Sequence, residues 1–108
     1  MAKKTIPDEV RKEVEAIVDR FNQIVMKKPV YYYIPRYKGR FLYLDRFDHG
    51  RMRQTCRLEY TGQINKWKFA IFKYSDMAYD PDEWMFPGSG HIDGTIEGAM
   101  RAGMDAYP

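Results

Sequence analysis

The chain has 108 residues, of which 44% are apolar and 16% aromatic, and its formal net charge at pH 7 is +3. This length suits one hydrophobic core and is too short for two, so we expect a single domain over residues 1–108. The aromatic content disfavours disorder, and the absence of an apolar run of about 18 residues predicts that no segment spans a membrane. A single cysteine, Cys56, cannot form an internal disulfide and indicates a reducing, cytoplasmic location.

The N-terminal segment has the apolar period of an amphipathic helix. Val14, Ile17 and Val18 belong to a stripe of apolar residues that recur at spacings of three and four. Thr5 is a candidate N-cap, with a proline following in the first turn, and Pro29 is expected to stop the helix. The sequence therefore predicts a helix between these two residues.

The middle of the chain changes to the two-residue period that is typical of strands. The expected strands are 31–34, 40–47, 51–61 and 67–74. Gly39 and Gly50 supply the turns between the first three, and Pro35 places the first strand at an edge or at a break. Short connections of this kind favour an antiparallel meander of three to four strands.

The last part of the chain is acidic and ends in a second expected helix. An expected short helical turn at 80–84 is followed by a glycine-rich loop and then by a helix from Asp93 or Thr95 to about Ala106. The predicted fold class is thus α+β, with an N-terminal helix, an antiparallel three- to four-stranded meander and a C-terminal helix. Both helices are expected on one face of the sheet.

This order of elements resembles that of the double-stranded RNA-binding domain, in which a helix and a meander also precede a second helix. The second helix of that family opens with a lysine-rich motif. Here the corresponding residues 94–98 are acidic and glycine-rich. The resemblance therefore implies a topology, and no function is carried over from it.

The charge is divided unevenly along the chain, and this division indicates a binding surface. Residues 1–75 carry a balance of +9, whereas residues 76–108 carry −6. Strict alternation along 51–61 would place arginines on one face, next to lysines and aromatic rings of the neighbouring strands. Cations interleaved with aromatic rings bind single-stranded nucleic acid through its phosphates and bases. The candidate nucleic-acid-binding residues are Arg51, Arg53, Arg57, Lys66, Lys68, Tyr43, Phe72 and Tyr74.

Two other interpretations of the same face stay open. Alternating charged residues are also how an antiparallel sheet is solvated on its outer face. Alternatively, a second copy of the chain covers the face, so that the basic face of one copy meets the acidic C-terminal segment of another in a homodimer. An acidic protein is a further expected partner.

The acidic segment is a second candidate site, for a divalent cation or a small ligand. Its oxygen-rich side chains and one imidazole suit Mg²⁺, Mn²⁺ or Ca²⁺ better than structural Zn²⁺. The candidate residues are Asp80, Asp82, Glu83, His91 and Asp93. The competing interpretation is that these acids favour helix N-termini and solubilise a loop, so the sequence calls for no metal and no cofactor.

The sequence offers little support for catalysis. Cys56 falls among apolar neighbours on its strand, where burial keeps a thiol protonated and inert. His49 belongs to a turn, and the chain contains no nucleophile elbow, P-loop or dinucleotide fingerprint. The sequence thus predicts a small non-catalytic binding module, whose expected ligand is nucleic acid or another polyanion.

Overall fold

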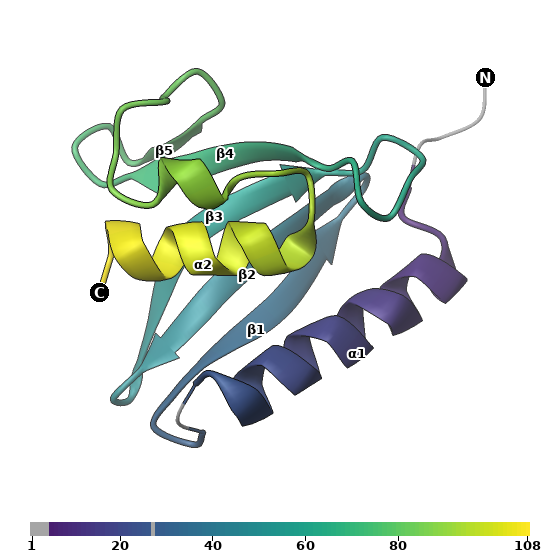
Figure 1. Cartoon of the computed structure of the whole chain (residues 1–108), viewed down its shortest axis with the longest axis horizontal. Helices are drawn as coiled ribbons and strands as arrows, with labels where there is room; N and C mark the ends of the chain where they lie inside the picture. Colours follow the sequence, from purple (N-terminus) through teal and green to yellow (C-terminus); the bar gives the residue numbers. More distant parts are fainter. Residues whose placement is uncertain (1–4, 27) are drawn as a thin grey trace.

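The computed structural model describes residues 5–26 and 28–108 (Figure 1). Its elements are α1 Asp8–Ile24, β1 Tyr31–Lys38, β2 Phe41–Asp48, β3 Arg51–Glu59, β4 Lys68–Lys73, β5 Ala78–Asp80, the 3-10 helix η1 Ser89–His91 and α2 Ile96–Ala106. The strands form one antiparallel sheet in chain order, β1-β2-β3-β4-β5. The predicted α+β class and meander are confirmed, with one strand more than expected.

The two helices meet the sheet around one buried side chain. Tyr33 of β1 is 1% exposed, and its hydroxyl group donates a hydrogen bond of 2.7 Å to the carbonyl oxygen of Met100 in α2. Its ring also lies 6.1 Å from the ring of Phe21 in α1. Figure 1 shows α2 in front of β2 and β3 and α1 alongside β1. These contacts are consistent with both helices packing on the same face, and residues from Ile6 to Met100 share one core.

The first helix begins later and ends earlier than its pattern predicts. Its N-cap is Pro7, which has extended backbone angles, and Thr5 does not cap it. Ile6 is buried and donates its N–H to the carbonyl oxygen of Gly39, so this segment lies beside the β1–β2 turn. The negative charge of Asp8, in the first turn of α1, still interacts favourably with the positive end of the helix dipole.

The first strand is an edge strand, and α1 protects its outer edge. The side chain of Asn22 accepts a hydrogen bond of 2.9 Å from the N–H of Tyr33 and donates one of 2.9 Å to its carbonyl oxygen. The amide group thus takes the place of a neighbouring strand. β1 also continues through Pro35 to Lys38, beyond its predicted end, because an edge strand tolerates a residue without an N–H.

The β2–β3 hairpin contains an irregularity that decides which side chains share a face. Its two-residue loop has positive φ at both His49 and Gly50, as a type I′ turn requires. Leu44 pairs with Cys56, but the next residue of β2 pairs with Gln54. Thr55 is therefore an extra residue, a β-bulge, and it reverses the side-chain alternation along β3.

The segment after β4 differs from its prediction. A turn through Met77, which has positive φ, leads into the short strand β5, so Asp80 ends a strand and the expected helical turn at 80–84 is absent. Thr95 caps α2 by accepting a hydrogen bond from the N–H of Gly98, and α2 ends at Ala106, where the sequence predicts its end. Neither helix in the described part of the chain has the length and hydrophobicity of a membrane span.

Candidate nucleic-acid interface

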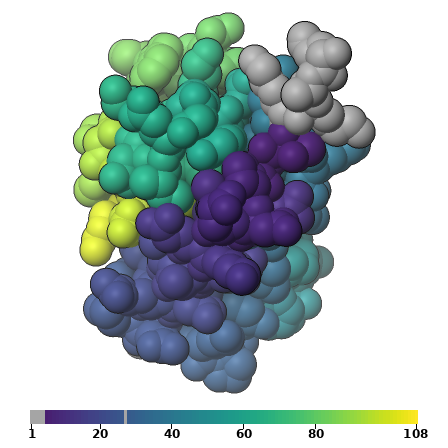
Figure 2. Space-filling model, turned by 90° about the vertical axis from the view of Figure 1, so that its right-hand side faces the viewer, coloured from purple at the N-terminus to yellow at the C-terminus, as the bar shows by residue number. Residues whose placement is uncertain are grey.

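The sheet has one face that lies opposite to the helices. Side chains alternate along each strand and match across paired strands, so the register identifies the residues on the face that Tyr33 does not occupy. We call this the open face; it carries Tyr32, Ile34, Arg36, Lys38, Phe41, Tyr43, Asp45, Phe47, Met52, Gln54, Arg57, Glu59, Lys68, Ala70, Phe72 and Tyr79. In Figure 2, the first strands (blue) and the C-terminal end of the chain (yellow) lie on opposite sides of α1 (purple).

The centre of the open face is a cluster of aromatic rings around Arg57. The guanidinium carbon of Arg57 lies 4.5 Å from the ring centre of Phe41 and 5.4 Å from that of Tyr79. The ring centre of Tyr79 also lies 5.3 Å from that of Tyr43, although β5 and β2 are not neighbouring strands. Ala70 lies opposite Arg57 on β4, the strand between β3 and β5. The result is a half-buried arginine held between two aromatic side chains.

A second arginine extends this cluster onto β1. The guanidinium carbon of Arg36 lies 4.3 Å from the ring centre of Tyr43, and its Nε atom donates a hydrogen bond of 2.9 Å to Asp45. That hydrogen bond raises the pKa of Arg36 above its ordinary value. Asp45 is 7% exposed, so the carboxylate is largely withdrawn from solvent while the arginine stays accessible.

The two ends of the open face add further rings and charges. Tyr32 and Phe47 form a ring pair with centres 5.2 Å apart, and the Nζ atom of Lys28 lies 5.3 Å from the ring of Tyr32. At the other end, Lys68 is exposed and opposite Glu59 in the register. The carboxylate of Glu59 forms an ion pair of 3.3 Å with Arg40, which lies in the turn between β1 and β2. The face therefore presents rings along its whole length, with cations at its ends and centre.

Three of the predicted binding residues lie together on this face. Tyr43, Arg57 and Lys68 come from β2, β3 and β4. Phe72 lies on the same face, but at 2% exposure it cannot stack on a base, because Tyr79 and Tyr74 cover it with rings 4.9 and 4.8 Å away. The prediction that Phe72 offers a stacking surface is therefore wrong.

The remaining predicted residues do not join the open face. Arg53 pairs with Arg46, whose side chain donates to the carbonyl oxygen of Gly103 in α2, so the bulge at Thr55 turns Arg53, and with it Arg51, to the helix side. The prediction that these two arginines share a face with Arg57 is wrong for that reason.

Two more predicted residues lie at the ends of β4. Lys66 belongs to the loop before β4 and is exposed. Tyr74 follows the end of β4, and its hydroxyl donates a hydrogen bond of 2.7 Å to the carbonyl oxygen of Gln54. Neither residue belongs to the ring cluster around Arg57.

Sequence reasoning missed three residues at the centre of the face. Arg36 lies beyond the predicted end of its strand, the sequence pattern assigned no face to Phe41, and Tyr79 lies on the unpredicted strand β5. The alternation of Phe41, Tyr43 and Phe47 along β2 was an available signal for Phe41. No such signal exists for Tyr79, because a strand of three residues has no measurable period.

The structure does not bring the five candidate ligands of the acidic segment together. Lys73 neutralises part of this segment, since its Nζ atom lies 3.0 Å from Glu83 and 3.7 Å from Asp80. The pKa of Glu83 is lowered, mainly because Lys73 donates a hydrogen bond to it. Asp82 donates its own N–H to Asp80, which is the hydrogen bond of a turn.

The rest of that segment is engaged in the approach to α2. The Nε2 atom of His91 lies 3.0 Å from a carboxylate oxygen of Asp105. The carboxylate of Asp93 accepts hydrogen bonds from the hydroxyl group and the backbone N–H of Thr95. Those bonds lower the pKa of Asp93. Over residues 5–26 and 28–108, no group of three histidine, cysteine or carboxylate side chains is placed to hold a metal ion.

Cys56 lies in the core below α2. It is fully buried, and its Sγ atom lies 4.0 Å from the carbonyl oxygen of Ala99. Burial raises the pKa of its thiol far above the ordinary value, so the group stays protonated. The predicted burial of this thiol is confirmed.

Comparison with known proteins identifies no relative from which a function could be transferred. No protein-family model matches the chain, and neither a curated protein nor a solved structure is significantly similar to it.

Proposed function

We propose that the protein is a non-catalytic module that binds single-stranded nucleic acid on the open face of its sheet. One observation carries this proposal, namely the cluster in which Arg57 lies between Phe41 and Tyr79 and Arg36 lies over Tyr43. Aromatic rings and guanidinium planes on a sheet stack with unpaired bases, and neighbouring cations neutralise phosphates. The single buried cysteine fits a reducing location, and we propose the cytoplasm.

Single strands suit this face better than a duplex does. The rings project from a sheet surface and offer planes on which bases can stack, which requires bases that are not already stacked in a helix. The cations are spread along the face, where they can follow one phosphate backbone. Among the described residues, no helix lies on this face that could enter a major groove.

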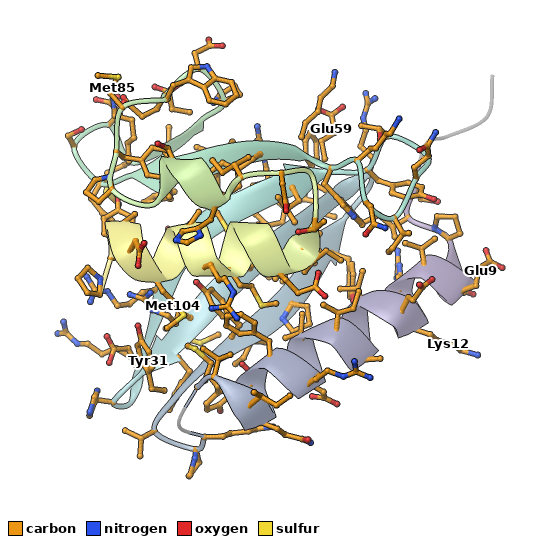
Figure 3. All side chains as sticks on the ribbon, viewed as in Figure 1. Glu9, Lys12, Tyr31, Glu59, Met85 and Met104 are labelled. Atoms are coloured by element: carbon orange, nitrogen blue, oxygen red, sulfur yellow. The ribbon has the colours of Figure 1, made fainter. Side chains whose placement is uncertain are left out.

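Fluorescence anisotropy with a labelled single-stranded oligonucleotide at low salt tests the proposal. Lys68→Glu reverses an exposed charge on the open face, and Lys12→Glu makes the same change on the outer side of α1 (Figure 3). We expect the first variant to weaken binding by about tenfold and the second by less than about twofold. Tyr43→Ala should also weaken binding about tenfold or more, through lost stacking.

Circular dichroism of each variant shows whether the fold is kept. A duplex of the same sequence should bind more weakly than the single strand. The proposal is wrong if the single strand does not bind at low salt, or if Lys12→Glu and Lys68→Glu weaken binding equally.

A homo-oligomer is the second candidate, and an exposed loop favours it. Trp84 and Met85 are 63% and 89% exposed, and Met85 lies at the tip of the loop after β5 (Figure 3). Asp82 and Glu83 precede this pair, so the loop has the chemistry to dock on the basic, aromatic open face of a second copy. Light scattering at low and high salt tests this candidate, which a monomeric mass in both conditions excludes.

A further inference from the structure

The third strand is longer than the partner on one of its sides. β3 pairs with β2 along its length, but β4 pairs only with the part from Cys56 to Glu59. The bulge at Thr55 marks the place where β4 ends its pairing. Within the described part of the chain, residues 51–54 therefore form an edge without a partner strand on the side away from β2, and we call them the β3 edge.

The backbone of the β3 edge points hydrogen-bonding groups into the space beside it. The carbonyl oxygen of Gln54 faces that side, since Tyr74 donates its hydroxyl hydrogen to it over 2.7 Å. In a strand, residues two apart point their N–H and C=O groups to the same side, so those of Met52 face the same space. Among the described residues, no strand pairs with Met52 on this side.

An open groove of about 640 Å³ lies along this edge, which leaves room for another chain. It is lined by Asp48, His49, Arg51, Met52, Arg53 and Tyr74. Met52 is 54% exposed, although it is a large apolar residue. Unpaired backbone groups, a groove and an exposed apolar side chain are together the features of a site where an extended peptide adds to a sheet.

The charges of the groove indicate the chemistry of the added strand. Arg51 and Arg53 point to the α2 side of β3, while Met52 points to the open face. The carboxylate of Asp48 is already engaged, since its oxygens lie 2.6 Å from Nδ1 of His49 and 3.4 Å from Nη1 of Arg53. The hydrogen bond with His49 is the main reason that the pKa of Asp48 is lowered. Two arginines against this one carboxylate leave the groove with an excess of positive charge.

This charge favours an acidic peptide over a second copy of the chain. If two copies paired through the same edge, Arg51 and Arg53 of one would face the arginines of the other, which is unfavourable. An acidic strand would instead place carboxylates opposite them.

We propose that the β3 edge binds an extended acidic peptide as an additional strand of the sheet. The peptide carries acidic side chains at alternate positions, which face Arg51 and Arg53, and apolar side chains between them, which contact Met52. Its backbone bonds to the outward N–H and C=O groups of Met52 and to the outward N–H of Gln54. This site is separate from the open-face cluster around Arg57.

A pair of N-methylated peptides tests the backbone part of the proposal. The probe is a fluorescein-labelled peptide in which glutamate and valine alternate, titrated with the full-length protein in an anisotropy experiment. N-methyl groups on one alternate set of residues block the donors that face the β3 edge, and the same groups on the other set face solvent. We expect one set to weaken binding about tenfold or more and the other by less than about twofold.

Protein variants test the residues of the site. Met52→Pro removes an N–H that faces the groove and leaves the pairing with β2 intact, so binding should fall at least about tenfold. Arg51→Glu should abolish binding of the acidic peptide, whereas Arg20→Glu, an equal charge change at an exposed position of α1, should have little effect. Lys68→Glu on the open face should also leave peptide binding within about twofold, which separates this test from that of nucleic-acid binding.

Three outcomes would overturn the proposal. The first is an equal effect of the two methylation patterns, which would mean that the peptide does not pair as a strand. The second is equal binding of a lysine–valine peptide, and the third is a dimer in light scattering that Met52→Pro dissociates. If Met52→Pro lowers the melting temperature, the methylated peptides decide, because they leave the protein unaltered.

Discussion

At the scale of single residues, Asn22 shows how one side chain protects the edge of a sheet. It is 3% exposed, and both of its hydrogen bonds go to the backbone of Tyr33. We expect Asn22→Ala to lower the free energy of unfolding by about 2 to 4 kcal/mol, because it leaves a buried N–H and a buried carbonyl without a partner. Urea denaturation measures this change.

The neighbouring residue supplies the control for that variant. Gln23 is exposed on the same helix, so Gln23→Ala should change the free energy of unfolding by less than about 0.5 kcal/mol. Similar effects of the two substitutions would contradict the role assigned to Asn22.

Residue types in the sequence predicted the chemistry of the open face better than they predicted exposure. Tyr43 and Arg57 occupy the face as expected, because strand alternation places them correctly near the middle of the sheet. Phe72 was predicted from the same alternation and is buried. The difference arises because Tyr79, from a strand without a sequence signal, covers Phe72 together with Tyr74.

At the scale of elements, the close packing of α2 depends on glycine. A Cβ atom on Gly98 would fall against the backbone carbonyl oxygen of His91, whereas one on Gly90 would meet nothing within 4 Å. We expect Gly98→Ala to destabilise the protein by about 1 to 3 kcal/mol despite the higher helix propensity of alanine. Gly90→Ala should be neutral or slightly stabilising, because it restricts the unfolded chain.

Thermal and urea unfolding of the two alanine variants check this prediction. A Gly98→Ala protein as stable as the unaltered one would show that the loop before α2 moves away at no cost.

A single bulge explains the main error in the predicted site. Strict alternation from Arg51 to Glu59 predicts one face for three arginines, and the extra residue Thr55 divides them between two faces. Thr55 is 1% exposed, and its Cγ2 atom would lie 2.7 Å from a Cβ atom on Gly103. The position of Thr55 is therefore determined by its packing against α2. Packing of this kind determines where a bulge forms, and no local pattern in the sequence of β3 predicts it.

At the scale of the whole molecule, the one core predicts cooperative unfolding. Trp67 is 4% exposed and belongs to the same core as residues of both helices, whereas Trp84 is exposed. In a Trp84→Phe variant, the fluorescence of Trp67 should report unfolding at the same urea concentration as far-UV circular dichroism does. Transitions at different urea concentrations would show that the helices and the sheet unfold separately.

The charge division along the chain acquires a different meaning once the chain is folded. The sequence separates a basic body from an acidic segment, but Lys73 lies within 4.0 Å of three acids of that segment, at 3.0, 3.7 and 3.9 Å. Part of the acidic charge is thus neutralised within the molecule. The open face and the β3 edge carry accessible basic side chains, among them Lys68 and Arg51.

The sequence by itself determined the α+β class, the two helices, the two tight hairpins and the burial of Cys56. These features depend on local periods, on glycine at turns and on composition, all of which act between near neighbours in the chain. Only the tertiary structure decided that Tyr79 reaches Tyr43, that Thr55 forms a bulge and that no strand of the described residues pairs with the outer side of the β3 edge. Those outcomes depend on contacts between distant segments, because a short strand or a bulge is stabilised by what packs against it.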